Sequence, residues 1–239
     1  VSPQYEAEEK ITVNGNVDLY AVVFNRTTET DLTEDQLPQV DIYKYKQVIF
    51  VGDSRTEFME NVLTGMGESA TKNVKFVCSA GKGLDWFTTT GWAQLYSIVQ
   101  HDSNSILSKK TAVIFNFGVN DLSKSADYAE YYNWIAPQLK SKGCELYFMS
   151  VNPVNRLMLP NAGRADRSEA AVRSFNQYMK ANLSSAYTYI DMYSYLKSTG
   201  YSFASDHYGT GTVDDGLHYT TRTYKRIFAK CMDSLRVPA

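Results

Sequence analysis

The stretch that decides the fold is residues 48–54, Val-Ile-Phe-Val-Gly-Asp-Ser. Four consecutive β-branched or aromatic residues predict a strand that is buried on both faces. Gly52 and Asp53 predict a tight turn directly after it, which leaves the hydroxyl of Ser54 exposed at the carboxyl end of the strand. That end is where open α/β sheets gather their catalytic groups.

The rest of the chain repeats this alternation of strand and helix. Strand-like runs cover 47–51, 74–78, 111–117, 144–151 and 186–190, and helical segments cover 55–66, 91–101, 126–142, 167–183 and 220–235. The pattern predicts an α/β fold, a three-layer α/β/α sandwich with a five-stranded, mainly parallel sheet. Ser54, the glycines of 81–83, Asn120 and Asn152 each follow one of the first four strands, so we expect them at the same edge of the sheet.

A second string, Asp-Gly-Leu-His at 215–218, complements the first. Serine needs a base to remove its proton, and that base needs an acceptor that holds its tautomer. We therefore predict a catalytic triad of Ser54, His218 as the general base and Asp215 as its partner. Asp214 is the alternative partner of the histidine. The three side chains predict a serine esterase.

Composition narrows the class of protein. The chain has 239 residues, of which 44% are hydrophobic, and a formal net charge of −2, which gives no electrostatic reason to expect nucleic acid as a partner. No apolar run reaches the roughly 18 residues of a transmembrane helix. No Cys-x-x-Cys or His-Glu-x-x-His pattern is present, so we expect neither a metal nor another cofactor. The oligomeric state is open.

The first residues differ from the rest. Two β-rich runs flank Asn14-Gly15, which is a strong hairpin signal, and the piece resembles the closing hairpin of the internalin B-repeats of Gram-positive surface proteins. We therefore expect a hairpin remnant of an upstream repeat over 1–25, a polar linker over 26–45 and the main domain over 46–239. The alternative is a hairpin that belongs to the main domain. The resemblance implies a secreted or cell-surface location, as part of a larger protein.

Four short blocks in order resemble those of the SGNH hydrolases of the GDSL esterase/lipase superfamily. They are Gly-Asp-Ser at 52–54, Gly-Lys-Gly at 81–83, Gly-Val-Asn-Asp at 118–121 and Asp-Gly-Leu-His at 215–218. The resemblance covers about residues 46–236. It implies the predicted fold, a serine nucleophile and no cofactor. By contrast, Arg55 and Thr56 follow the serine, so the Gly-x-Ser-x-Gly elbow of the α/β-hydrolases is absent.

The resemblance also implies an oxyanion hole, built from the backbone N–H of Ser54, a backbone N–H of the glycine block and the side-chain amide of Asn120. The glycine block departs from the family pattern, which usually has a preceding Asn and two residues between the glycines. Here the order is Ser79-Ala80-Gly81-Lys82-Gly83. We favour Gly83 as the donor, with Gly81 as the alternate.

Four further residues are candidates for substrate contact: Arg55, Trp86, Asp121 and Asn152. Arg55 could meet an anionic group, Trp86 could form a wall of the acyl pocket, and Asn152 could shape the rim. Each also has a structural alternative. For Arg55 it is a helix-surface salt bridge, for Trp86 packing beneath the pocket, and for Asp121 hydrogen bonding behind the catalytic residues.

These features together predict an esterase that removes short acyl groups, foremost O-acetyl, from carbohydrate. The substrate class depends on the surface-protein resemblance and on an aromatic content of 13%. The alternatives are a lipid or lysophospholipid esterase, a cell-wall glycan O-acyltransferase, and a non-catalytic glycan-binding surface module. The expected partner is an acylated small molecule or glycan.

Overall fold

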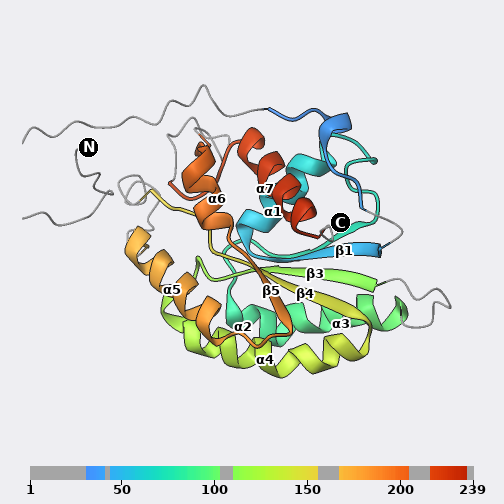
Figure 1. The fold of residues 1–239 in the computed structure, drawn as a ribbon, viewed down its shortest axis with the longest axis vertical. Helices are drawn as coiled ribbons and strands as arrows, with labels where there is room; N and C mark the ends of the chain where they lie inside the picture. The colour runs from blue at the N-terminus through green and yellow to red at the C-terminus, as the bar shows by residue number, and fades with distance from the viewer. Residues whose placement is uncertain (1–30, 41–43, 103–109, 156–166, 205–215, 236–239) are drawn as a thin grey trace, which may run out of the picture.

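The computed structural model describes residues 31–40, 44–102, 110–155, 167–204 and 216–235 (Figure 1). Its centre is a five-stranded sheet in the order β2-β1-β3-β4-β5, in which every neighbouring pair is parallel. The strands are β1 (Tyr45–Gly52), β2 (Val74–Cys78), β3 (Lys110–Asn116), β4 (Cys144–Met149) and β5 (Tyr187–Ile190). The predicted α/β architecture is confirmed, and all five strands lie within one or two residues of the predicted ranges.

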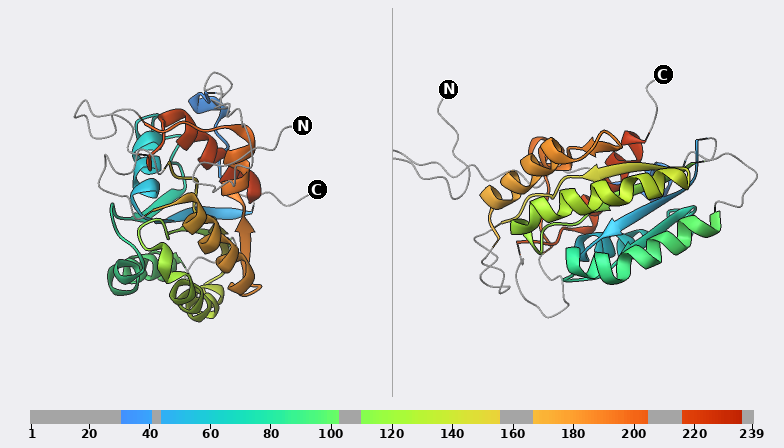
Figure 2. Two further views of the ribbon diagram at one scale, coloured as in Figure 1. Left: turned by 90° about the vertical axis from the view of Figure 1, so that its left-hand side faces the viewer. Right: turned by 90° about the horizontal axis from the view of Figure 1, so that it is seen from below.

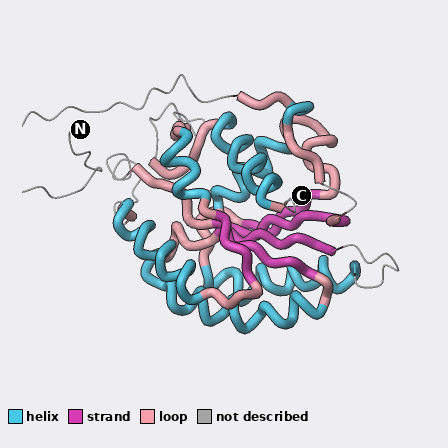
Figure 3. The backbone as a smooth tube through the Cα atoms, viewed as in Figure 1, coloured by secondary structure: helices cyan, strands magenta, loops and turns pink. Residues whose placement is uncertain are grey.

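Helices cover both faces of the sheet (Figures 2 and 3). On one face lie α1 (Ser54–Thr64), α6 (Met192–Thr199) and α7 (Thr221–Ser234). The other face carries α2 (Leu84–Trp86), which continues through a π-helical turn (Phe87–Gly91) into α3 (Trp92–Asp102), together with α4 (Ser125–Ser141) and α5 (Glu169–Asn182). The five helices predicted from the sequence are all present.

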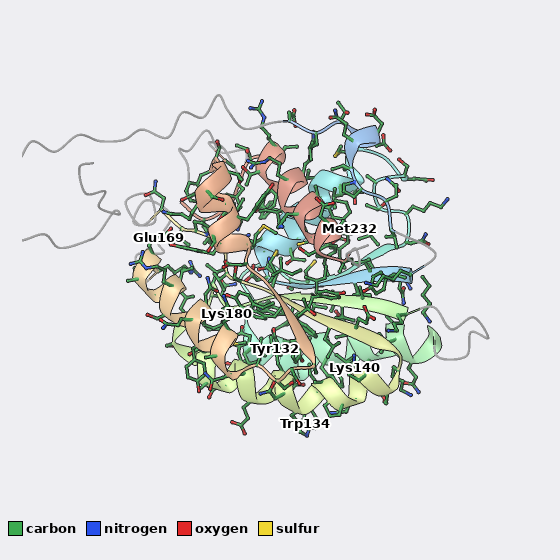
Figure 4. All side chains as sticks on the ribbon, in the orientation of Figure 1. Tyr132, Trp134, Lys140, Glu169, Lys180 and Met232 are labelled. Carbon is green, nitrogen blue, oxygen red and sulfur yellow. The ribbon has the colours of Figure 1, made fainter. Side chains whose placement is uncertain are left out.

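Each face of the sheet packs its own hydrophobic core. In β1, Ile49 and Val51 belong to the core under α3, α4 and α5, whereas Val48 and Phe50 belong to the core under α1, α6 and α7. This alternation follows from the two-residue period of a strand and explains why the run 48–51 is apolar throughout. Tyr132 of α4 lies in the first of these cores, while Trp134 of the same helix is exposed (Figure 4).

The strand order creates the position of the functional edge. The chain leaves β1 through α1 to β2 on one side, and then returns through α3 to β3 on the other side of β1. The connections that leave the carboxyl ends of β1 and β3 therefore run to opposite sides of the sheet order. The point between these two strand ends is a topological switch point, where ligands bind in open α/β sheets. Ser54 follows β1 and Asn120 follows β3, so both belong to this point.

Glycines make two close approaches possible at this edge. A Cβ at Gly52 would overlap the Thr56 side chain, because the first turn of α1 lies directly over the end of β1. Gly118 has a φ of +130°, and a Cβ there would lie 2.6 Å from the ring of Phe175. Both positions therefore require glycine for space, and Gly118 requires it for its backbone conformation as well.

Helix α6 is the main element that the sequence did not predict. Asp191 caps it by accepting from the Ser194 N–H at 3.1 Å, and Gly200, at φ +84°, ends it. These two residues were the available signal, since Asp before a helix and Gly after it are the usual cap residues. None of the described helices has the length and apolar character that crossing a membrane requires.

The predicted hairpin over 1–25 lies outside the described residues, and its division from a linker stays a prediction. Within the predicted linker, Leu37 and Val40 are buried in the core under α1 and α7. Tyr45 already begins β1. The described part of this stretch, 31–40, thus packs on the main domain.

Candidate functional site

The centre of the site is a contact between residues that are 164 positions apart in the chain. The Nε2 atom of His218 lies 2.8 Å from the Oγ atom of Ser54, and both side chains are buried. Ser54 is the first residue of α1, directly after β1. His218 lies just before α7, which packs on α1. The distance is that of a hydrogen bond between a nucleophile and its base.

Phe58 sets the plane of the histidine ring. Its ring lies one turn after Ser54 on α1 and meets the imidazole edge-on, with 4.8 Å between the ring centroids. Such a contact restricts rotation of the imidazole while its Nε2 faces the serine. Asp215, the predicted partner of His218, lies outside the described residues.

The first turn of α1 presents an N–H group at the nucleophile. Asp53 caps the helix, and its carboxylate accepts from the Arg55 N–H at 3.0 Å. The N–H of Ser54 has no hydrogen-bond partner among the described residues, as is usual for the first N–H groups of a helix. A negative charge that develops beside Ser54 would meet this group and the positive end of the helix dipole.

Asp53 is 1% exposed, and burial raises the pKa of its carboxyl group to about 6. The positive charges of Arg55 and Arg167 oppose that effect on the pKa of Asp53, and the negative charge of Asp121 adds to it. The ionised carboxylate beside the nucleophile is therefore less favourable than it would be in water, and its positively charged neighbours offset only part of that cost.

Asn120 lies across from the glycine block. Its Nδ2 group donates to the Lys82 carbonyl oxygen at 2.7 Å, and its Oδ1 atom accepts from Arg167 at 2.7 Å. The Lys82 carbonyl and the Gly83 N–H belong to the same trans peptide unit, so the Gly83 N–H is directed away from the Asn120 amide. The Gly83 N–H has no hydrogen-bond partner among the described residues.

Gly81, the alternate donor, has a different setting. It is exposed, its φ is +71°, and a Cβ there would meet no atom within 4 Å. At Gly83 a Cβ would overlap the Asp121 carboxylate, so the backbone must approach that side chain closely. The packing favours Gly83 as the position where only glycine fits.

Asp121 makes hydrogen bonds within the protein through both oxygens of its carboxylate, and its predicted substrate contact stays a prediction. One carboxylate oxygen accepts from the Leu84 N–H at 2.9 Å, and the other accepts from the Tyr128 hydroxyl at 2.8 Å. Burial raises the pKa of Asp121, and these two hydrogen bonds act in the opposite direction. The side chain thus ties the block that contains Asn120 to the start of α2.

The structure contradicts the predicted contact of Arg55 with an anionic group of the substrate. Its side chain is 2% exposed, and its guanidinium donates to three backbone carbonyls: to Leu217 at 3.0 Å, to Asn152 at 2.8 Å and to Pro153 at 2.8 Å. The guanidinium also lies 5.2 Å from the ring centroid of Tyr219. Arg55 therefore joins the loop after β4 to the segment that contains His218, because a buried cation needs acceptors on every side.

Trp86 and Asn152 have different settings. Trp86 is partly buried, packs against Phe117 at 6.1 Å between ring centroids, and lies over Gly91. Asn152 is 1% exposed and offers its backbone oxygen to Arg55. Burial removes Asn152 from the predicted rim, whereas a substrate contact of Trp86 stays a prediction.

Sequence reasoning missed Arg167. It precedes Ser168, the N-cap of α5, and reaches across to the loop after β3. Nothing in the sequence around position 167 marks it, because its partner lies 47 residues earlier in the chain. Only the packing of α5 beside that loop brings the two together.

The described residues offer no metal site, since they contain no group of three or more His, Cys, Asp or Glu side chains that could hold an ion. The chemistry that the site can perform is attack by a serine hydroxyl with a histidine base beside it. N–H donors from Ser54, Gly83 and Asn120 lie on three loops at the same edge of the sheet.

Comparison with known proteins agrees with this geometry. The sequence model of the GDSL-like Lipase/Acylhydrolase family matches residues 48–231, which is most of the chain. No curated protein matches the chain in sequence.

Solved structures show the same fold at low sequence identity. A protein from Bacteroides fragilis NCTC 9343, described as an acylhydrolase, is 17% identical, with a TM-score of 0.54 over 84% of this chain and 92% of that one. A protein from Slackia heliotrinireducens, described as an SGNH hydrolase, is 13% identical, with a TM-score of 0.53 over 81% of this chain and 100% of that one. An acetyl xylan esterase is 12% identical, with a TM-score of 0.51 over 80% of this chain and 100% of that one. The chain is therefore an acylhydrolase that belongs to the GDSL-like lipase/acylhydrolase family.

Proposed function

We propose that the protein is a serine esterase that removes short acyl groups, foremost O-acetyl, from carbohydrate. The observation that carries the catalytic part is the 2.8 Å contact between His218 Nε2 and Ser54 Oγ at the switch point of the sheet. The substrate class has weaker support, namely the aromatic content and the predicted surface location. That an acetyl xylan esterase has this fold shows that the architecture is compatible with deacetylation.

In the proposed reaction, Ser54 Oγ attacks the carbonyl carbon of the ester while His218 Nε2 takes the hydroxyl proton. The carbonyl oxygen becomes an oxyanion that accepts hydrogen bonds from the Ser54 N–H and from Asn120 Nδ2, and a glycine of the 81–83 block is the predicted third donor. The bond between the carbonyl carbon and the alcohol oxygen then breaks, and His218 returns its proton to the leaving alcohol. The product of this half-reaction is an acyl-enzyme on Ser54.

Water completes the cycle. His218 removes a proton from a water molecule, whose oxygen attacks the acyl carbon, and the Ser54 hydroxyl leaves as it regains a proton from His218. Asp215 is proposed to stabilise the imidazolium and to hold its tautomer.

The first experiment measures p-nitrophenyl acetate hydrolysis by wild type and by Ser54→Ala from pH 5 to 9. Ser141→Ala, which alters an exposed hydroxyl at the end of α4, is the matched control. We expect Ser54→Ala to lose several orders of magnitude in kcat and the control to match wild type. Equal turnover by Ser54→Ala and wild type would refute the assignment of the nucleophile.

A second experiment tests the substrate class by measuring acetate release from acetylated xylan, acetylated sialic acid and O-acetylated peptidoglycan. Release from one of these glycans, together with a rate that falls from C2 to C8 esters, is the expected result. Activity that rises with acyl chain length would favour a lipid ester as substrate. Transfer of the acyl group to a sugar hydroxyl in preference to water would indicate an acyltransferase.

A further inference from the structure

The Arg167 side chain donates hydrogen bonds to two neighbouring residues of the loop after β3. Its Nε group donates to the Val119 carbonyl oxygen at 2.6 Å, and its Nη2 group donates to Asn120 Oδ1 at 2.7 Å. One arginine thus holds both the backbone and the side chain of the segment that supplies the amide donor. We propose that Arg167 is a positioning residue that fixes the orientation of the Asn120 side-chain amide, so that its Nδ2 group faces the substrate carbonyl. This inference rests on the proposed function.

The orientation follows from the chemistry of the two neighbours of Asn120. A guanidinium only donates hydrogen bonds, so it selects the oxygen end of the amide. The Lys82 carbonyl only accepts, so at 2.7 Å it selects the nitrogen end. A rotation of the amide by 180° would place N–H against N–H and oxygen against oxygen. The two contacts together specify one orientation.

This arrangement leaves donor capacity for a ligand. The Nδ2 group has two hydrogens, and the contacts of Asn120 with other described residues use one of them, toward Lys82. The second hydrogen is available to an oxyanion beside Ser54. Without Arg167, the oxygen end of the amide would lose its charged partner, and the donor would be free to rotate away.

The charge of Arg167 adds to the effect of its geometry. A cation hydrogen-bonded to Oδ1 draws electron density from the amide, which makes the Nδ2 hydrogens stronger donors. Arg167 is half-buried, so solvent screens this charge only in part. Its positive charge also acts on Asp53, the residue before the nucleophile, whose pKa it lowers. The guanidinium thus lies within electrostatic reach of both parts of the site.

The decisive experiment observes the Asn120 amide directly, by NMR of protein labelled with 15N-asparagine, and it does not depend on turnover. Comparison with Asn120→Ala assigns the two Nδ2 proton signals in wild type. In Arg167→Met we expect those signals to shift toward each other and to exchange faster with water, while the other asparagine signals stay in place. Unchanged Asn120 signals in Arg167→Met would overturn the proposal.

Two further variants keep the experiment informative if Arg167→Met does not fold. Arg167→Lys keeps the charge but can satisfy only one acceptor well, so we expect Asn120 signals intermediate between those of wild type and of the methionine variant. Arg173→Met removes an exposed arginine of α5 and should leave the Asn120 signals unchanged. A lysine variant that matches wild type would also count against the proposal.

A double-mutant cycle then measures the consequence for catalysis. Arg167→Met should lower kcat about ten-fold with little change in KM, and Asn120→Ala should lower it about 10²–10³-fold. The double variant should be no slower than Asn120→Ala alone, because Arg167 acts through Asn120. Multiplying effects would refute that route. Failure of the proposed function would look different, since wild type and Ser54→Ala would then be equally inactive while the NMR signals still report on Arg167.

Discussion

At the residue scale, the position of Asp53 favours a negative charge in one respect and disfavours it in another. Its carboxylate caps α1 at the nucleophile, where a negative charge suits the helix N-terminus. The same carboxylate is almost fully buried, and burial raises its pKa from 3.8 to about 6. Because the folded protein binds this proton more tightly than the unfolded chain, Asp53 contributes stability below pH 3.8 that is lost as the pH rises through 6.

The Asp53→Asn variant should remove this pH dependence, because asparagine caps a helix as well as aspartate but does not ionise. We expect the free energy of unfolding of wild type to fall, relative to the variant, by up to about 3 kcal/mol between pH 4 and pH 7. Urea unfolding of both proteins at several pH values measures the difference. A difference that is constant with pH would show that the Asp53 pKa is not raised.

The two candidate oxyanion glycines give a second prediction. In Gly83→Ala the new methyl group would displace the Asp121 carboxylate next to Asn120, and we expect kcat to fall about 10²-fold. Gly81→Ala meets no neighbouring atom, so it should cost only the strain of a positive φ, about 1–2 kcal/mol of stability, and leave kcat nearly unchanged. Steady-state kinetics of the two variants separates the positions. The reverse pattern would assign the donor to Gly81.

At the element scale, the site depends on how the loop after β4 is joined to the segment before α7. Arg55 makes this connection from the first turn of α1, through three backbone carbonyls. Tyr219 reinforces it from the other side, since its hydroxyl donates to the Pro153 carbonyl while its ring faces the guanidinium. The helix that starts at the nucleophile therefore also holds the backbone beside the base.

Arg55→Met should remove three hydrogen bonds to buried backbone carbonyls and lower the free energy of unfolding by about 2–4 kcal/mol. It should also lower kcat, because the backbone at Leu217 precedes His218 directly. The measurement is urea unfolding together with p-nitrophenyl acetate kinetics, with the exposed-site variant Arg173→Met as the control. A variant as stable and as active as wild type would show that the carbonyl contacts of Arg55 are dispensable.

At the scale of the whole molecule, the proposed mechanism activates Ser54 through His218 and requires no metal ion. We expect dialysis against EDTA to leave kcat and the thermal unfolding midpoint unchanged, because the described residues contain no cluster of metal ligands. Activity measured before and after dialysis, and after addition of Zn²⁺ or Mg²⁺, tests this. A loss of activity that a metal restores would contradict the serine–histidine mechanism as the whole source of activation.

The surface-module resemblance of residues 1–25 and the secreted or cell-surface location stay predictions. The described stretch before β1 packs on the domain through Leu37 and Val40.

The sequence by itself determined the fold class, the five strands and the choice of Ser54 and His218 as the predicted nucleophile and base. These features are local. An apolar run such as 48–51 indicates burial on both faces of a strand, and Gly-Asp-Ser indicates a turn and a helix cap. The family resemblance added Asn120 and the glycine block. The meeting of Ser54 with His218 was predicted from the residue types of a triad, and the strand order was not predicted, since neither is written in any single segment.

Only the tertiary structure decided which polar residues support the site from behind. Arg55, Asp121 and Arg167 carry charges whose partners the sequence does not identify, and these partners include residues 162, 37 and 47 positions away, respectively. The role of a long polar side chain depends on which acceptors and donors the fold brings within about 3 Å of it. That distance is a property of packed loops and helices, and no periodicity in the chain encodes it.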